Sequence, residues 1–418
     1  MGVRIRHRYN VQCFKECACP HKKDDAPVWQ VGVTRNHRRC AHDVKRSLCA
    51  LTRLLLPMAL HVAYGPRGVK KLCASLSDGS EGLASNLLTL NGLLSNQETK
   101  MEALQNDGVV VTVLTNLLAS TEAEVRRQAA LAIASLTLVY QGRIAAADAL
   151  TVAALCGPLR EDRDDEVRAA CASALESLTS SRDGCSVVMD ADAIVSKLTE
   201  ALDDAHAPVL PPTIAALANM LRLDLGVDEA LGAGVVEKLA KLVDPSQRDA
   251  KLLETSLQAL WNLANTPNGK TAAIKAGLLD VLAVQMRHAY PNVRRLAAGC
   301  VMAITIDKDG KLGSLPCVEP LAEMLFDPTV DSSAVRDAVG AIKNMSEYPK
   351  VRKSVDTWAK KHSAHDAMAQ VFNEPLYDHK QWPASIRFQH QNVAPGGAAA
   401  ADEAATRERW GYPKPFAA

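Results

Sequence analysis

Aromatic residues are scarce in this sequence of 418 residues. They make up 4% of the chain, although hydrophobic residues as a whole make up 48%. The interior must therefore be built mainly from Ala, Leu and Val, which favour close-packed helices. A strand-rich fold would need more aromatic and β-branched residues, so the composition favours an all-α protein.

Net charge and long apolar runs are lacking as well. Lys plus Arg and Asp plus Glu nearly cancel at +1, so the chain as a whole has no attraction to nucleic acid or to an anionic membrane. No apolar run reaches the roughly 18 residues that a membrane helix needs, and the opening MGVRIRHRYNVQCF has no hydrophobic signal core. We therefore expect a protein of the cytosolic compartment, without a membrane or nucleic-acid partner.

Disulfides and metal sites are not expected either. Most cysteines beyond residue 60, such as Cys171 and Cys300, lie among Ala and Leu in helical patterns, which indicates buried reduced thiols. The CxxxCxC pattern near the N-terminus lacks the two-residue spacer common in structural zinc sites, so we predict no metal there. The Cys and His residues that gather in that segment are Cys13, Cys17, Cys19, His21, Cys40 and His42.

A repeat of about 42 residues runs through the middle of the chain. The segment EVRRQAALAIASLT at Glu124 recurs as EVRAACASALESLT at Glu166, and related segments follow. Their first core residues step by 42, 42, 43 and 41, and the same step reaches Leu83 backwards and a point near Val335 forwards, which makes seven units. These first core residues are Val125, Val167, Val209, Leu252 and Val293.

Each unit holds two main amphipathic stretches and room for a short third helix. Within the recurring segment, apolar residues are three and four positions apart for about three turns, and a second amphipathic stretch, such as AGVVEKLAKLV from Ala233, precedes it. A pair of helices in a unit of this length is the armadillo or HEAT signature. We therefore predict an all-α, right-handed superhelical solenoid of about seven 42-residue repeats, because single units cannot bury their apolar faces alone.

The segment ANTPNGKT, from Ala264 to Thr271, fits a relaxed phosphate-loop pattern. In the repeat frame, however, Gly269 follows the last core residue Leu263 by six positions, and glycine recurs at that offset in the other middle repeats. We therefore interpret Gly269 as a turn glycine with a left-handed backbone. A phosphate loop also needs a preceding strand, whereas QALWNLA has a helical pattern, so no nucleotide is expected.

No other pattern indicates catalysis. His206 and His288 lie in expected turns, without a cysteine or carboxylate at a ligand or triad spacing, and are interpreted as solvated turn residues. The acidic run REDRDDEV, with Asp164 and Asp165, lacks the glycine of a calcium loop and is typical of helix-start capping. The sequence predicts a protein that is not an enzyme and holds no cofactor.

The groove lined by the last helix of each repeat is the expected binding surface, because it is repeated and is not used up by stacking. The residues just before the last core position form a ladder of mostly short polar side chains that could hold an extended peptide backbone. Alternatively, they satisfy carbonyl groups of neighbouring helices. The ladder residues are Ser135, Ser177, Asn219, Asn262, Ala303 and Asn344, of which all but Ala303 are candidate binding residues.

A nuclear import adaptor of the karyopherin alpha type would carry a tryptophan four residues before each ladder asparagine. The corresponding residues here contain no aromatic ring, and Trp261 stands beside Asn262 instead, so we expect Trp261 to pack between helices. The sequence therefore disfavours that reading. The residues at the tryptophan positions are Leu131, Ser173, Ala215, Gln258, Gly299 and Gly340.

Four segments divide the chain. Residues 1–57 are basic, with eleven Lys and Arg against four Asp and Glu among the first fifty, and have little pattern; residues 58–353 form the repeats. Residues 354–372 should form one capping helix. Residues 373–418 are rich in Pro and aromatic rings, which indicates an extended tail whose rings bind the chain's own solenoid or a neighbouring protein. The predicted tail anchors are Trp382, Phe388, Trp410, Tyr412 and Phe416.

Three stretches of the chain resemble a known family. HVAYGPRGVKKL at the start of the repeats, AITIDKDGK in the sixth and AIKNMSEYPKVRKSV at the end are similar to the armadillo-repeat protein of the ciliary radial spoke, the radial spoke head protein fourteen family. The resemblance spans residues 61–355. It implies a non-enzymatic building block of the spoke, located in the axoneme of motile cilia or flagella, with other spoke proteins as partners.

Two functions remain open at this point. The first is a structural and interaction protein of the axoneme, which would depend on its tail. The second is a soluble cytosolic or nuclear armadillo adaptor that binds linear peptides in its groove and would depend on Asn219 and Asn262.

Overall fold

The computed structural model describes residues 68–77, 82–105, 108–327 and 330–373. Within these ranges every regular element is a helix, and none is a strand. The basic segment 1–57, its Cys and His residues, and the tail from residue 374 lie outside the described residues. The same holds for the tail anchors Trp382, Phe388, Trp410, Tyr412 and Phe416, whose role stays a prediction.

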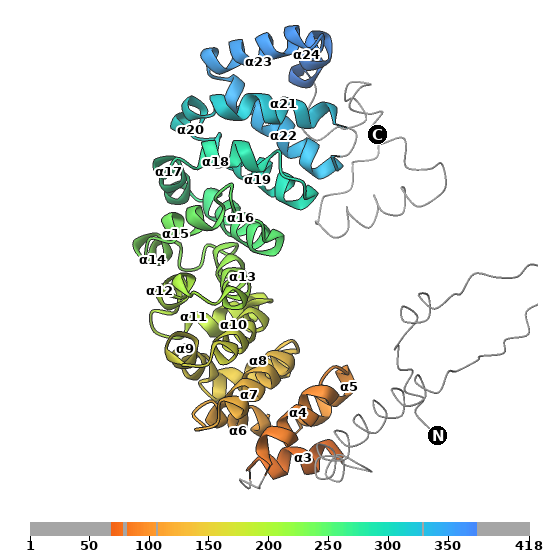
Figure 1. Ribbon diagram of the computed structural model, residues 1–418, viewed down its shortest axis with the longest axis vertical. Coiled ribbons are helices and arrows are strands. Elements are labelled where there is room, and N and C mark those ends of the chain that lie inside the picture. The colour runs from red at the N-terminus through yellow and green to blue at the C-terminus, as the bar shows by residue number, and fades with distance from the viewer. Residues whose placement is uncertain (1–67, 78–81, 106–107, 328–329, 374–418) are drawn as a thin grey trace, which may run out of the picture. The chain divides into compact units, whose positions relative to one another are not determined.

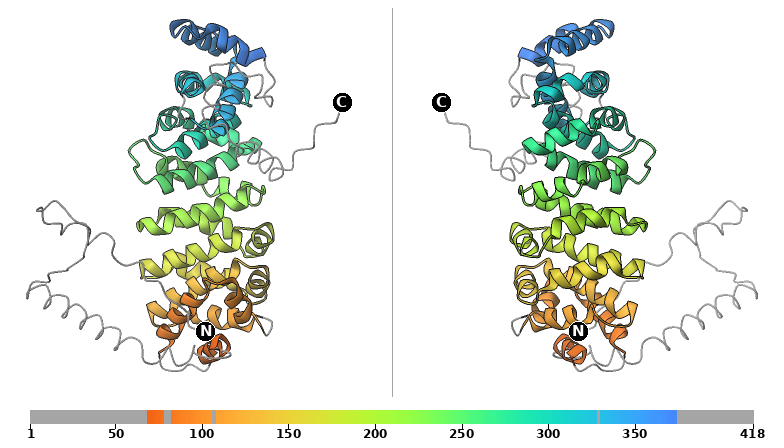
Figure 2. Two further views of the ribbon diagram at one scale, coloured as in Figure 1. Left: turned by 90° about the vertical axis from the view of Figure 1, so that its right-hand side faces the viewer. Right: turned by 90° about the vertical axis from the view of Figure 1, so that its left-hand side faces the viewer.

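Seven helices correspond to the recurring segment of the sequence, and we call them the third helices of their repeats. Each contacts the next along the chain. Figure 2 shows most of them as rods stacked one above another, and Figure 1 shows α13, α16, α19 and α22 following one another on one side of the stack. The third helices are α4 (Leu83–Leu93), α7 (Ala123–Thr137), α10 (Asp165–Thr179), α13 (Leu210–Leu221), α16 (Ala250–Ala264), α19 (Pro291–Ile304) and α22 (Ser332–Ser346).

Two further helices complete each middle repeat, as the spacing predicts. Short first helices follow the third helix of the preceding repeat: α5 (Gln97–Ala103), α8 (Tyr140–Asp148), α11 (Arg182–Met189), α14 (Val227–Gly232), α17 (Pro267–Lys275) and α20 (Lys308–Gly313). Second helices come next and begin with α3 in the first unit: α3 (Gly68–Ser77), α6 (Val109–Leu117), α9 (Thr151–Glu161), α12 (Ile194–Glu200), α15 (Val235–Leu242), α18 (Leu278–Gln285) and α21 (Val318–Phe326). Single 3-10 turns accompany some of them: η1 (Ala201–Asp203), η2 (Ala207–Val209) and η3 (Leu315–Cys317).

The core follows the repeat frame of the sequence. The first core residues, Val125 to Val293 in the middle repeats, are each at most 5% exposed, and so are the last core residues of the same repeats. Alanines such as Ala129 and Ala172 are fully buried between them, which lets neighbouring helices approach closely. The predicted all-α solenoid is therefore confirmed. The last core residues are Leu136, Leu178, Met220, Leu263 and Ile304.

The turn glycines have a different role from the expected one. Gly269 lies inside α17 with a helical backbone, so the prediction of a left-handed conformation is wrong there. A Cβ atom at Gly269 would lie 2.0 Å from the carbonyl oxygen of Leu263, at the end of the preceding third helix. Gly142, Gly184 and Gly310 meet the same obstacle, while Gly226 alone in this series has a positive φ, of 69°. Glycine is required mainly because the two helices approach so closely.

Left-handed residues occur instead one position before five second helices, α6, α9, α12, α15 and α18, whereas Cys317 before α21 has a φ of −84°. Gly108, Gly234 and Gly277 have φ angles of 72°, 75° and 69°. In the two repeats between them the same position carries Leu150 and Ala193, with φ angles of 53° and 48°. A side chain in this region costs about 1–2 kcal/mol relative to the ordinary helical region, so these two repeats carry local strain.

The chain after the last third helix forms two helices, not the single capping helix expected from Ser354 to Phe372. α23 (Pro349–Lys361) ends where Ser363 adopts a φ of 54°, and α24 (His365–Asn373) begins just beyond. The amide of Ala364 donates to the carbonyl of Ala359 at 2.8 Å, which closes the end of α23. Phe326 of α21 and His362 stack on Trp358 of α23 with ring centroids 5.8 Å and 4.3 Å away, so this helix continues the packing of the repeats.

Candidate partner-binding face

The predicted ladder residues occupy equivalent positions on successive third helices. Ser135 lies on α7, Ser177 on α10, Asn219 on α13, Asn262 on α16 and Asn344 on α22. All but Asn262 are half-buried, while Asn262 is 7% exposed and Ala303 of α19 only 1%. We call the surface that the third helices form around these positions the third-helix face.

Two ladder asparagines donate to the preceding third helix. Asn262 Nδ2 donates to the carbonyl oxygen of Ala218 at 2.7 Å, and Asn344 Nδ2 donates to that of Met302 at 3.1 Å. Satisfying neighbouring carbonyls, the alternative left open by the sequence, is therefore what these two side chains do here. Asn219 differs, because its amide makes only a 3.5 Å contact with Thr179 Oγ1. Binding of a partner by the ladder stays a prediction.

The third-helix face is hollowed between α13, α16 and α19. The hollow has a volume of about 220 Å³. Its lining contains two oppositely charged side chains, Glu254 and Arg295, and three amides, Asn219, Gln258 and Asn292. The rest is Ala215, Ala218, Thr255 and Leu296. The site therefore offers both donors and acceptors over a floor of small side chains, which suits one polar side chain of an extended polypeptide.

Trp261 lies beside Arg295, one of the residues that line the hollow. It is half-buried on α16, and a Cβ atom at Gly299 of α19 would lie 2.9 Å from its ring. The Arg295 guanidinium carbon lies 5.9 Å from the ring centroid, in a cation–π contact. The ring thus packs between two third helices, as the sequence predicts, and contacts Arg295.

Two partly desolvated carboxyl groups lie on the third helices that flank the hollow, one on α10 before α13 and one on α22 after α19. Burial raises the pKa of Glu176 on α10, and the charge of Lys251 acts in the opposite direction. Burial also raises the pKa of Asp337 on α22, to about 6, while the charges of Arg336 and Arg295 oppose this effect. Charges on these helices are therefore coupled between repeats, as expected where solvent is partly excluded.

The phosphate-loop-like segment is a junction between two helices. α16 ends at Ala264 and α17 begins at Pro267, so a helix precedes the segment, not a strand. The Thr266 hydroxyl accepts from the amide of Gly269 at 3.2 Å, and Lys270 Nζ donates to the carbonyl oxygen of Asn265 at 3.0 Å. The groups that a phosphate would need serve instead to join the two helices.

The described cysteines are poor nucleophiles. Six free cysteines are described, and all except Cys73 are buried. Burial raises the pKa of Cys73 to about 11 and that of Cys171 to about 12, so both are protonated near neutral pH. Among residues 68–77, 82–105, 108–327 and 330–373 there is no group of three or more His, Cys, Asp or Glu placed to hold a metal ion.

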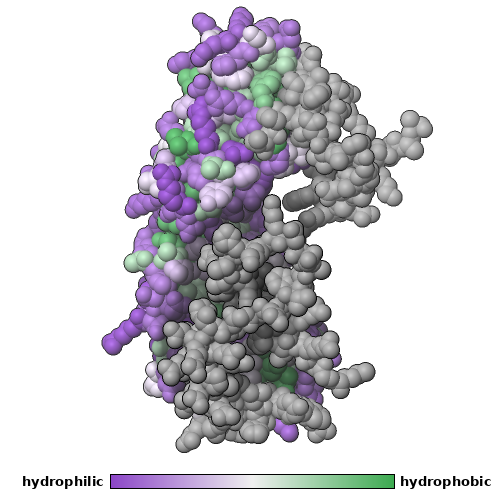
Figure 3. All heavy atoms as spheres, turned by 45° about the vertical axis from the view of Figure 1, so that its right-hand side comes forward, coloured by the Kyte–Doolittle hydropathy of each residue, from purple (hydrophilic) through white to green (hydrophobic). Residues whose placement is uncertain are grey.

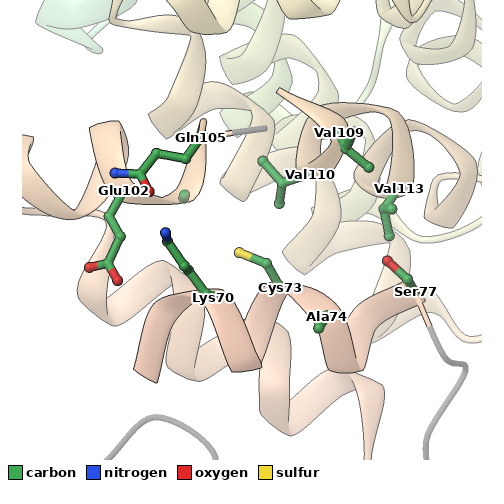
Figure 4. Close-up of a pocket in the computed structure, with 10 residues that line it drawn as sticks. Lys70, Cys73, Ala74, Ser77, Glu102, Gln105, Val109, Val110 and Val113 are labelled. Atoms are coloured by element: carbon green, nitrogen blue, oxygen red, sulfur yellow. The ribbon is translucent and has the colours of Figure 1, made fainter. Parts of the chain in front are cut away.

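A second hollow, of about 140 Å³, lies near the N-terminal end of the described repeats. Figure 4 shows Lys70 and Glu102 on one side, Val109 and Val113 on the other, and Cys73 between them. Because the Cys73 thiol is protonated, this arrangement offers no activated nucleophile.

The acidic run at the start of α10 contacts a histidine of the next repeat, which the sequence does not indicate. Asp164 caps α10 by accepting from the amides of Glu166 and Val167 at 3.0 and 3.2 Å, as predicted. His206 is not a freely solvated turn residue, because its side chain is 24% exposed and lies 3.7 Å from Asp165 and 3.5 Å from Glu166. The sequence could not show this, since these residues meet only when consecutive repeats stack.

The visible surface of the described repeats is mainly hydrophilic, with small separate apolar patches (Figure 3). Across the described part of the chain, no single helix is long and apolar enough to span a membrane. The bent pair α8 and α9 passes such a test only by length and composition, and both helices contribute buried residues to the core.

Comparisons with known proteins identify the fold. No protein-family model matches the chain, and no curated protein matches it. An engineered protein from a structural genomics programme is similar over 77% of this chain and 76% of its own, with a TM-score of 0.64 and 24% identity. A designed armadillo repeat protein matches over 56% of this chain and 99% of its own, with a TM-score of 0.51 and 20% identity. Another, in complex with the peptide (KR)4, has the same coverage and TM-score at 22% identity. The chain has an armadillo-type repeat fold.

Proposed function

We propose that this chain is a non-enzymatic interaction scaffold of the axonemal radial spoke in motile cilia or flagella. Its third-helix face and its aromatic tail would bind neighbouring spoke proteins. The observation that carries the interaction role is the repeated third-helix face, hollowed beside Asn219 and lined with polar side chains. The axonemal location rests on the sequence resemblance.

Two of the three stretches that carry the resemblance also meet in space. Lys311, from AITIDKDGK, forms an ion pair with Glu347, from AIKNMSEYPKVRKSV. Asp307, which also belongs to AITIDKDGK, caps α20 by accepting from the amide of Asp309 at 2.8 Å. The two stretches therefore form one structural unit where α20 meets α22. This contact supports treating their similarity to the radial spoke family as one feature.

Extraction of demembranated cilia tests this proposal. Cilia are treated in turn with detergent, moderate salt and a chaotropic salt, and each fraction is blotted for this chain. A spoke scaffold should appear only in the chaotropic fraction and sediment with a large complex. Release by detergent, or absence from cilia, would contradict the axonemal role.

A soluble adaptor for linear peptides is the second candidate. The hollow between α13, α16 and α19 favours it, and a structural neighbour with the same fold binds the peptide (KR)4. Two variants separate the candidates. Deletion of residues 373–418 should leave the repeats folded but prevent incorporation of the proposed scaffold into the axoneme. A soluble adaptor that lacks the same residues should still bind its peptide, and should lose that binding with Asn219→Ala. Asn219 is preferred to Asn262, because the Asn262 side chain also links α16 to the Ala218 carbonyl of α13, so its loss would disturb the packing of the two helices.

A further inference from the structure

The solvent face of α23 concentrates positive charge. Five of the 13 residues of this helix are Lys or Arg, and Asp356 is its only acidic residue. Val351, Val355 and Ala359 recur every four residues and are at most 1% exposed, so they form the packed side of the helix. The lysines lie on the other side and are exposed. We call them the α23 lysine face: Lys350, Lys353, Lys360 and Lys361.

α23 packs against α21 and α22 at the end of the stack, where Figure 1 shows it beyond both helices. The fifth cation of the helix, Arg352, is already engaged, because its guanidinium carbon lies 5.4 Å from the ring centroid of Phe372 on α24. The α23 lysine face is therefore a surface on a packed helix, and it presents only lysine ammonium groups.

Two of these lysines lie where a positive charge destabilises the helix. Lys350 is in the first turn of α23 and Lys353 directly follows that turn, in which there is no acidic residue. The N-terminal end of a helix carries a partial positive charge, so cations are unfavourable there, and lysines three residues apart repel each other. Lys360 and Lys361, in the last turn, are at the favourable end. The stability of α23 therefore does not explain Lys350 and Lys353.

No ion pair within the described ranges offsets this charge. The lysines that form ion pairs there are Lys238 and Lys311, and neither belongs to the α23 lysine face. The two ends of the chain lack the complementary charge in their composition. The first fifty residues carry eleven Lys and Arg against four Asp and Glu, and residues 374–418 carry five of each. The α23 lysine face is therefore complementary to another molecule, not to the ends of this chain.

A carboxylate-rich polypeptide fits this face better than a nucleic acid or a membrane does. Surfaces that bind nucleic acids combine cations with aromatic rings that stack on bases, whereas the Trp358 ring already stacks with Phe326 and His362. A membrane-bound helix inserts its apolar side, which in α23 is buried in the protein. Separate carboxylates match lysine ammonium groups, each of which is a compact point charge. The 13 residues of α23 extend about 20 Å, the length of about six residues of extended chain.

We propose that the α23 lysine face docks an acidic segment of a partner protein, whose Asp or Glu carboxylates accept hydrogen bonds from the four lysines. This surface is separate from the third-helix face, and the inference does not depend on the axonemal location. It gives the chain a second contact, at the C-terminal end of the described repeats. Negative charge defines the partner.

Fluorescence anisotropy with the full chain measures this binding. The probes are fluorescein-labelled peptides of eight glutamates and of eight glutamines, and an oligonucleotide of eight thymidines, at about 150 mM salt to screen non-specific attraction. The glutamate peptide should bind most tightly. Lys350→Glu combined with Lys353→Glu should weaken its binding about tenfold, because attraction is replaced by repulsion. Lys70→Glu combined with Lys71→Glu, at exposed positions of α3, makes the same change in net charge and should alter the dissociation constant less than about twofold.

Thermal unfolding followed by circular dichroism separates lost binding from lost structure. Lys350→Glu and Lys353→Glu place negative charge at the start of α23, where the helix dipole favours it. The unfolding midpoint of this variant should therefore equal or exceed that of the wild type, although its binding is weaker.

Lysine acetylation followed by mass spectrometry locates the bound peptide on the full chain. This matters because the cations among the first fifty residues also attract an acidic peptide. The glutamate peptide should slow acetylation of Lys350 and Lys353, and should leave that of Lys70 and Lys71 unchanged.

Four results would overturn the docking face. They are unchanged acetylation of Lys350 and Lys353, equal effects of the two double substitutions on peptide binding, equally tight binding of the thymidine oligonucleotide, and sedimentation with phosphatidylserine vesicles that the α23 substitutions abolish. Self-association of the chain that the α23 substitutions abolish would instead identify a second copy as the occupant, and would also contradict the proposal.

Discussion

Arg168 and Asp204 form a two-point ion pair that joins consecutive repeats. Arg168 Nε donates to Asp204 Oδ2 at 2.6 Å and Nη2 donates to Oδ1 at 3.0 Å, while Nη1 donates to the carbonyl oxygen of Asp162 at 2.9 Å. Arg126 and Asp162 repeat the arrangement one unit earlier. The side chains of Arg168 and Asp204 are 14% and 10% exposed, so this pair is partly shielded from water.

Replacing Asp204 with Asn should destabilise the repeats by about 2 kcal/mol, because a charge-assisted pair with two bonds loses its ionised acceptor. Urea unfolding followed by circular dichroism measures the change. Glu200→Gln is the control, since the Arg160 and Glu200 pair is 41% and 51% exposed and should contribute at most about 0.5 kcal/mol. Equal effects of the two substitutions would show that shielding does not matter here.

The same pair predicts a pH dependence. The hydrogen bond from Arg168 lowers the pKa of Asp204 below its usual value, against the effect of burial. A carboxyl group whose pKa is lower in the folded protein contributes stability that is complete above its unfolded pKa and is lost as pH falls through its folded pKa. The stability difference between the wild type and Asp204→Asn should therefore be constant near neutral pH and shrink in acid. A difference that grows as pH falls would contradict the assignment.

The repeat frame is the part of the fold that the sequence predicts well. The repeat period located the third helices and their core residues, because all repeats share one register. It also showed that Gly269 recurs at one position of the repeat, which argued against a phosphate loop. The packing of Trp261 between helices followed from its position beside Asn262. These features depend on the pattern within one repeat, which a single sequence displays directly.

Features that depend on the distance between repeats were not predicted. The close approach of Gly269 to Leu263 and the hollow above Ala218 arise from how far apart two helices lie, and periodicity contains no such distance. The left-handed series had an available signal, since Gly108, Gly234 and Gly277 recur in register. Leu150 and Ala193 interrupt it and obscure the pattern.

Leu150 and Ala193 provide a test of local strain. Leu150→Gly should stabilise the protein by about 1 kcal/mol, because glycine adopts a positive φ without the steric cost that leucine has there. The leucine side chain is 74% exposed, so little packing is lost. Ala193→Gly should act in the same direction. Thermal unfolding of both variants checks this, and a lower midpoint for Leu150→Gly would show that its exposed side chain makes contacts that outweigh the strain.

Helix capping gives a second route to stabilisation. Asp249 caps α16 by accepting from the amides of Lys251 and Leu252 at 2.9 and 3.1 Å, whereas Tyr290 occupies the same position before α19 and provides no side-chain cap. Tyr290→Asp should therefore stabilise the protein by about 1 kcal/mol, and Asp249→Ala should destabilise it by a similar amount. Urea titration of both variants measures the shifts. Destabilisation by Tyr290→Asp would indicate that the stacking of Tyr290 on His288 matters more than the missing cap.

Gly269 and Gly277 separate two reasons for glycine within one repeat. Gly277→Ala places a methyl group in open space at a φ of 69°, so it should cost about 1 kcal/mol from the backbone alone. Gly269→Ala should cost more, up to roughly 3 kcal/mol, because its Cβ atom would meet the Leu263 carbonyl oxygen and push α16 and α17 apart. Comparing their unfolding midpoints in urea tests this order, and a smaller cost at Gly269 would contradict the close-approach explanation.

Lys270→Ala tests whether the same segment binds a nucleotide. Isothermal titration with ATP should give no binding with or without the lysine, because Lys270 donates to the carbonyl oxygen of Asn265. ATP binding that disappears in Lys270→Ala would instead require a phosphate site at this turn.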